Sequence, residues 1–195
     1  MVFNVCLHQE NLPPPTAEKK LIACGIERDD LCKVYLLPFE VTKEIKLSMF
    51  QYKINHHILP TNNLLHKMKK VDSPYCPFCP SETHTIWHLF IDCMCAASFW
   101  AKFQDWYYNI SGMKPDLTDL DIAFGIIHSS EPCLALNHLI LVGKYFLYVN
   151  ATANNQRHFS EFVSLAREKI LLEKYIAVTS GNINQYNRKW NSLNF

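Results

Sequence analysis

The sequence predicts a mainly α-helical fold: a helical domain with an embedded cluster of cysteine and histidine residues. Glycine, which weakens helices, is scarce, with 5 residues in 195. Apolar residues recur at helical spacing through several stretches that contain neither glycine nor proline. Four of the eight cysteines fall within the single short segment 76–95. A content of 49% hydrophobic and 19% charged residues is typical of a globular chain and excludes a disordered or collagen-like one.

The first region, residues 1–41, is expected to be an irregular N-terminal segment. Three consecutive prolines, residues 13–15, interrupt any regular structure there. A short helix at 17–24 is the exception that the pattern allows, and Gly25 would end it. Apart from this short helix, we therefore expect regular helical structure to begin at Thr42.

The second region, residues 42–110, begins with a helix at 42–58, capped by Thr42 and ended by Pro60. The helix has two apolar faces, which predicts packing on both sides. One face carries Leu47, Phe50, Ile54 and Ile58, the other Ile45, Met49 and Tyr52, and the polar side carries Glu44, Ser48, Gln51 and Asn55. A short helix at 64–68 follows, with Thr61 as a possible cap.

A further helix is expected to start at Ser81 or Thr83 and to reach the break at Ser111 and Gly112. Its aromatic side chains recur at helical spacing. Such a stripe indicates core packing more often than a platform for stacking bases, and we favour the core interpretation. The aromatic residues are Trp87, Phe90, Phe99, Trp100, Phe103, Trp106 and Tyr107.

The third region, residues 111–195, is predicted to be a helical part packed on the second. It contains a short segment at 120–127, an apolar helix at 132–151 and a helix at 159–179 that Gly181 closes. The apolar stretch 134–149 includes Asn137, His138 and Lys144 and is shorter than the roughly 20 residues that a membrane span requires. It is predicted to be a buried core helix.

The strongest motif is C-x2-C-x8-H-x4-C, formed by Cys76, Cys79, His88 and Cys93. Three thiolates and one imidazole are suited to tetrahedral zinc, and four protein ligands leave no position for a catalytic water. A structural zinc ion is therefore predicted. Two alternatives to Cys93 remain open, His84 and Cys95, because His88 and Cys93 would lie about 140° apart on an ideal α-helix.

Positive charge gathers immediately before this motif, although the whole chain carries only +1. The segment 42–70 has six lysines against one acid, Glu44. Such a segment suits contacts with phosphates, and the competing interpretation is an ordinary solvated face. The candidate nucleic-acid-binding residues are Lys46, Lys53 and His57 on the first helix, followed by Lys67, Lys69 and Lys70.

The first residues lack the basic and apolar regions of a secretory signal peptide. The expected location is therefore the nucleus or cytoplasm, and no membrane association is predicted.

The segment FQYKINHHILPTN at 50–62, with the motif at 76–93 and Phe99-Trp100, resembles the zinc-binding region of non-LTR (LINE-type) retrotransposon reverse transcriptases. The resemblance continues through residues 122–125, 136–138, 143–145 and 189–190, so it runs from about residue 42 to the end. It implies a helical accessory domain, stabilised by a zinc ion, that follows the polymerase core and helps to hold template RNA or target DNA. The implied ligands are those of the motif, and the implied partners are the RNA or DNA backbone and the polymerase domain of the parent polyprotein.

Polymerase chemistry requires paired carboxylates, and the only adjacent pair, Asp29 and Asp30, lacks the family's sequence context. Asp116 and Glu131 have the spacing of a nuclease pair, but Pro132 favours a helix start where a strand would be needed. The chain is thus expected to be a nucleic-acid-binding fragment without catalytic residues. The alternative is a zinc-stabilised helical structural or protein-interaction module that binds no nucleic acid.

Overall fold

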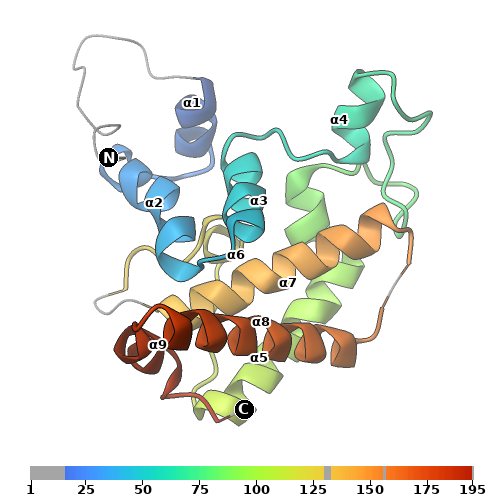
Figure 1. Ribbon diagram of the computed structural model, residues 1–195. Helices are drawn as coiled ribbons and strands as arrows, with labels where there is room; N and C mark the ends of the chain where they lie inside the picture. Colours follow the sequence, from blue (N-terminus) through green and yellow to red (C-terminus); the bar gives the residue numbers. More distant parts are fainter. Residues whose placement is uncertain (1–15, 130–132, 156, 195) are drawn as a thin grey trace.

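The computed structural model describes residues 16–129, 133–155 and 157–194. Within these ranges the chain forms helices and no β-strand, and one isolated antiparallel bridge joins Tyr75 to Thr83. The prediction of a mainly α-helical fold is confirmed. The α-helices are α1 (Thr16–Ala23), α2 (Leu31–Val41), α3 (Ile45–Asn55), α4 (Asn62–Lys67), α5 (Met94–Ser111), α6 (Asp119–Phe124), α7 (Leu134–Thr152), α8 (Phe159–Thr179) and α9 (Ile183–Trp190) (Figure 1).

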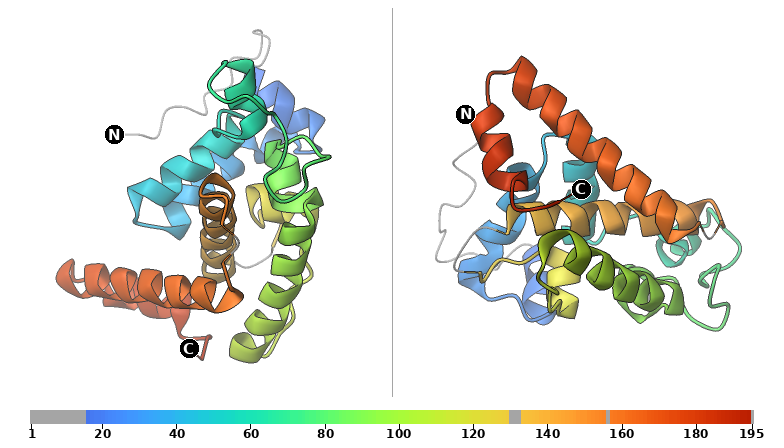
Figure 2. Two further views of the ribbon diagram at one scale, coloured as in Figure 1. Left: turned by 90° about the vertical axis from the view of Figure 1, so that its right-hand side faces the viewer. Right: turned by 90° about the horizontal axis from the view of Figure 1, so that it is seen from below.

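Helix α7 forms the centre of the molecule. The left view of Figure 2 shows α7 nearly end-on, with α3 and α5 on opposite sides of it and α8 across its lower end. Most of its residues are buried, as expected for the apolar stretch 134–149. No helix within the described ranges is both long enough and apolar enough to cross a membrane.

The aromatic residues of α5 pack into this core. Phe99 and Phe103 are buried and contact Phe162 of α8 with ring centroids 5.0 and 5.8 Å apart. A Cβ at Gly143 of α7 would lie 3.0 Å from the Phe99 ring, so the absence of a side chain lets α5 approach α7 closely. The expected aromatic stripe is thus a core stripe along α5.

The short helix expected at 17–24 is present as α1 (Thr16–Ala23), but the expectation of an irregular segment is wrong for residues 31–41, where α2 forms. The proline run itself lies outside the described residues. Pro38 lies inside α2 and leaves the carbonyl of Val34, four residues earlier, without its helical donor. Asn55 of α3 donates its side-chain Nδ2 to that oxygen at 3.2 Å. A contact distant in sequence therefore lets α2 continue through the proline.

Helix α3 is buried on two sides, but the second buried side differs from the predicted one. Ile45 is 78% exposed and Met49 43% exposed. The side expected to be polar and exposed is instead buried: Ser48, Gln51 and Asn55 are each at most 3% exposed. Their polar groups are satisfied inside the protein, so burying them against α2, α6 and α7 carries no large desolvation penalty.

Lys144 of α7 is one of these internal partners. Its ammonium group is fully buried and donates to Gln51 Oε1 at 2.5 Å and to the carbonyl of Ala123 at 2.8 Å. Burial lowers the pKa of Lys144 from 10.5 to about 7. The lysine thereby joins α3, α6 and α7.

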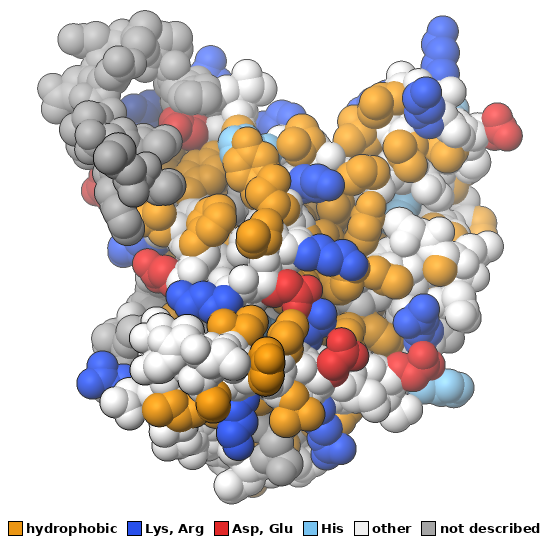
Figure 3. Space-filling model, viewed as in Figure 1, with side chains coloured by type: hydrophobic (Ala, Val, Ile, Leu, Met, Phe, Trp, Pro, Cys, Tyr) orange, Lys and Arg blue, Asp and Glu red, His pale blue; other side chains and the backbone are white. Residues whose placement is uncertain are grey.

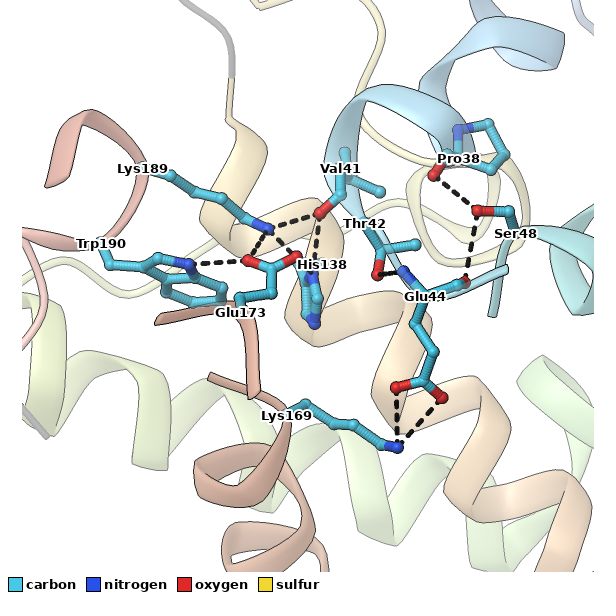
Figure 4. A network of polar contacts seen from close by, with 10 residues as sticks. All are labelled: Pro38, Val41, Thr42, Glu44, Ser48, His138, Lys169, Glu173, Lys189 and Trp190. Atoms are coloured by element: carbon cyan, nitrogen blue, oxygen red, sulfur yellow. Dashed lines mark hydrogen bonds and ion pairs between the residues drawn. The ribbon is translucent and has the colours of Figure 1, made fainter. Parts of the chain in front are cut away.

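A second polar network ties the C-terminal helices to the end of α2 (Figure 4). Glu173 of α8 accepts hydrogen bonds from Lys189 at 2.7 Å and from Trp190 Nε1 at 2.9 Å. Lys189 and His138 both reach the carbonyl oxygen of Val41. Burial alone would raise the pKa of Glu173, but His138 and Lys189 lower it to about 2.

Candidate metal centre and basic surface

The four side chains of the motif come together in the structure. One ligand atom each from Cys76, Cys79, His88 and Cys93 lies within 4.8 Å of the others. Cys76, His88 and Cys93 are at most 5% exposed, and Cys79 is half-buried. This Cys3His group is therefore positioned to hold a metal ion.

A closed loop positions the first two cysteines. The Cys76 N–H donates to the Glu82 carbonyl at 2.8 Å, and the Glu82 N–H donates back to the Cys79 carbonyl at 2.9 Å. The bridge between Tyr75 and Thr83 extends this pairing by one residue on each side. The loop thus folds back on itself and turns both thiols toward one point.

A single turn of π-helix, His88–Asp92, positions the other two ligands. The Cys93 N–H donates to the His88 carbonyl at 2.9 Å, an i→i+5 bond. Cys93 then takes an extended conformation and α5 begins at Met94. The continuous helix expected from Ser81 or Thr83 to residue 111 is therefore wrong, because this turn and the break at Cys93 interrupt it.

The structure also separates the two alternatives from the group. His84 is buried, and its Nδ1 accepts the N–H of Asn62 at 3.1 Å, which ties the cysteine loop to α4. Burial and the neighbouring His88 lower the pKa of His84 to about 4, so its ring is neutral. Neither His84 nor Cys95 belongs to the set of atoms within 4.8 Å.

The donor set fits zinc. His88 Nε2 is buried and has no hydrogen-bond partner among the described residues, so it is free to bind a metal ion, and it shares this property with the Nε2 atoms of His57, His84 and His138. The Sγ atoms of Cys79 and Cys93 are 3.6 Å apart. Tetrahedral zinc with Zn–S bonds of about 2.3 Å would place two sulfurs about 3.8 Å apart.

The lysines predicted to bind nucleic acid lie on two elements. Lys46 and Lys53 are exposed on α3, and the Lys46 ammonium lies 5.1 Å from the centre of the Tyr145 ring. Lys67, Lys69 and Lys70 are exposed at the end of α4 and just beyond it, where the chain projects from the body (Figure 1). Along the chain, the second group directly precedes the segment 71–75 that leads into the cysteine loop.

None of these five lysines forms an ion pair with a described residue. The one acid of the segment 42–70, Glu44, is paired with Lys169 of α8 at 2.8 Å. Figure 3 shows Lys and Arg side chains spread over this face, with several Asp and Glu side chains between them. The positive charge of the five lysines remains available to an anionic partner.

His57 is placed differently from the lysines of α3. It is half-buried, with φ at 55°, and it lines a cavity together with Lys67 and Lys20. Sequence reasoning missed Lys20 because the candidate residues were taken from the basic segment 42–70, whereas Lys20 lies in the short helix expected at 17–24. A Lys19-Lys20 pair on an amphipathic helix was the one signal that could have found it.

The fold and this centre define a helical zinc-binding domain. Residues 37–100 match the family model for the zinc-binding domain of reverse transcriptases. This part of the chain, about a third of its length, is therefore similar to the zinc-binding domain found in reverse transcriptases, typically those of non-LTR retrotransposons. The match includes all four residues of the metal group and ends within α5. No curated protein matches the chain.

Proposed function

We propose that the chain is an accessory domain of a non-LTR retrotransposon reverse transcriptase that holds the backbone of RNA or target DNA in the nucleus or cytoplasm. The observation that carries this proposal is the set of five exposed lysines without acidic partners beside a Cys3His centre. Lys46, Lys53, Lys67, Lys69 and Lys70 would contact phosphates, with His57 contributing from α3's C-terminal end. Such contacts hold a strand in place without reading its sequence.

Zinc would have a structural role in this function. Cys76, Cys79, His88 and Cys93 would complete its coordination, which leaves no open position for a substrate or an activated water. The ion would fix the cysteine loop against the π-turn, and the hydrogen bond from Asn62 to His84 would carry that order to α4. The lysines of α4 would thereby gain a defined position.

The zinc-binding domain is the one domain that the family comparison finds, and no catalytic domain is detected. Of the proposed nuclease pair, Glu131 lies outside the described residues, and Asp116 lies in the loop before α6. The neighbouring Lys114 is paired with Asp105 of α5 at 2.7 Å. The proposal therefore assigns binding to this chain and polymerisation to the polymerase domain of the parent polyprotein.

Salt-dependent binding tests the proposal. The zinc-loaded chain should bind fluorescent single-stranded RNA and duplex DNA with an affinity that falls steeply as salt rises. The triple variant Lys67→Gln, Lys69→Gln, Lys70→Gln should lower the slope of log affinity against log salt by about 2 to 3, since each lost phosphate contact removes about 0.7 to 0.9.

A matched variant, Arg167→Gln, Lys174→Gln, Arg188→Gln, removes the same charge from α8 and α9 and should leave the slope unchanged. Equal slopes for the wild type and the α4 triple variant would refute the proposed contacts.

One observation favours the second candidate, a protein-interaction module. Apolar side chains are exposed on neighbouring parts of α2 and α3, where Phe39 is 54% and Ile45 78% exposed. Figure 3 shows apolar side chains gathered on this side of the molecule. An exposed apolar patch often marks a protein interface, and the polymerase domain would be its partner.

The double variant Ile45→Ser, Met49→Ser separates the candidates. It should retain RNA binding if the lysines carry the function. If the second candidate holds, the wild type shows no salt-dependent RNA binding, and the double variant loses binding to a polymerase domain added in trans.

A further inference from the structure

A cavity of about 450 Å³ lies among α1, α3, α4, α6 and the segment that leads into the π-turn. Figure 1 shows α1 and α4 on either side of the C-terminal end of α3. The volume is within the range of pockets that hold small organic groups. Its walls are mainly apolar and include Leu64, Ile86, Trp87, Ile91 and Phe124.

Positive charge borders these apolar walls. Lys20 of α1 and Lys67 of α4 both line the cavity and are exposed, and no Asp or Glu is among the residues that line it. Neither lysine forms an ion pair with a described residue. An apolar cavity with two unpaired cations at its edge favours a ligand that is flat and apolar in the middle and anionic at its ends.

His57 adds an unused polar group. Its Nε2 is buried without a hydrogen-bond partner among the described residues. Burial, followed by the nearby charges of Lys20 and His56, lowers the pKa of His57. A neutral imidazole at this position can donate or accept one hydrogen bond from an occupant of the cavity.

We propose that this cavity receives the base of one unpaired nucleotide of a bound strand, while Lys20 and Lys67 contact the phosphates on its two sides. The inference rests on the proposed function and adds to it a preference for single-stranded segments. A paired base cannot leave its duplex without loss of stacking and pairing, whereas an unpaired base enters at little cost. Trp87 supplies an aromatic ring, which accepts any base and so gives no sequence preference.

Cys24 provides a direct readout, because this free thiol lines the cavity. The full zinc-loaded chain is treated with a maleimide, and alkylation of Cys24 is followed by peptide mass spectrometry. Single-stranded oligoadenylate at about ten times its Kd should slow this alkylation roughly tenfold, since only the unbound fraction stays open. Alkylation of Cys133, a half-buried thiol just before α7 that does not line the cavity, should keep its rate.

A duplex of the same length, added at equal occupancy, should leave Cys24 reactive. If the single strand binds with the expected salt dependence and Cys24 stays equally reactive, the base pocket is refuted and the backbone-binding function stands. If no oligonucleotide binds at all, both fail. If free AMP protects Cys24 at lower concentrations than the strand does, the cavity is a mononucleotide site and the inference is overturned.

A pair of variants tests the charged edge. Lys20→Gln should reduce the salt slope for single strands by about 0.7, the loss expected for one phosphate contact. Lys19→Gln changes the neighbouring exposed lysine of α1, which does not line the cavity, and should leave the slope unchanged. Equal slopes for these two variants would contradict the contact from Lys20.

Discussion

The backbone N–H of Cys93 donates to the carbonyl oxygen of His88 at a distance of 2.9 Å, five residues back along the chain. An α-helix would place the two side chains about 140° apart. The wider π-turn brings Cys93, five residues further on, closer to the side that His88 faces, so both side chains reach one point. The same turn ends one helical segment and lets α5 start directly after the last ligand.

This relationship predicts which cysteine holds the metal. Cys93→Ser should reduce bound zinc well below one ion per chain, because it removes one of four donors. Cys95→Ser changes a half-buried thiol two residues away and should keep one zinc ion per chain. Elemental analysis of both purified variants measures the difference. Equal zinc content in the two variants would contradict the assignment of Cys93.

The sequence was sufficient to find the metal group with Cys93 as its last member, but it left His84 and Cys95 open as alternatives. The C-x2-C pair and the imidazole follow from spacing alone. The choice between Cys93 and Cys95 depends on the local winding of the backbone, and a projection at 100° per residue assumes that winding. A π-turn has no composition of its own, so only the three-dimensional structure revealed it.

Two of the errors in the fold, at α2 and at the polar side of α3, have a common physical cause. Residues 31–41, which contain Pro38, were expected to be irregular, and Asn55 was placed on the polar side of its helix. In the structure each explains the other, because Asn55 supplies the hydrogen bond that Pro38 cannot. Interactions between residues far apart in sequence decide such cases, and local patterns contain no information about them.

Removal of the metal should unfold the centre before the core. Structural zinc contributes roughly 10 kcal/mol or more in small sites, whereas α7 and α8 are held by apolar packing. A chelator, or the variant Cys76→Ser, should abolish amide protection over about residues 74–93. Protection in α7 and α8 should persist. Hydrogen exchange with mass spectrometry resolves the two regions, and unchanged protection at 74–93 after metal removal would disprove a stabilising role for zinc.

The pair Pro38 and Asn55 predicts a non-additive effect on stability. Asn55→Ala leaves the carbonyl of Val34 buried without a donor, which should cost about 1 to 3 kcal/mol. In a Pro38→Ala background the new N–H can bond to that carbonyl, so the same change should cost less. Urea denaturation of the four proteins measures the coupling energy. Strictly additive losses would show that the bond from Asn55 does not compensate for the proline.

Lys144 predicts a rise in stability with pH. Its pKa is about 7 in the folded chain and 10.5 when the side chain is free in solution. Between these values the unfolded state binds more protons than the folded state, so the free energy of unfolding should increase as pH rises from 7 toward 10. Below pH 7 both states are protonated and Lys144 contributes no slope.

The variant Lys144→Met isolates this contribution. Other groups titrate in the same pH range, among them Lys189 with a pKa of about 8. Because these groups are present in both proteins, their effects cancel when the free energies of unfolding are subtracted. The wild type should gain stability relative to the variant as pH rises, as measured by urea denaturation at a series of pH values. Lys174→Met, at an exposed position of α8, should follow the wild type throughout. The free energies of unfolding of wild type and Lys144→Met could instead differ by a constant amount from pH 6 to pH 10. That result would mean that the ammonium group of Lys144 titrates as it does in water. The burial of Lys144 among α3, α6 and α7 would then not hold in solution.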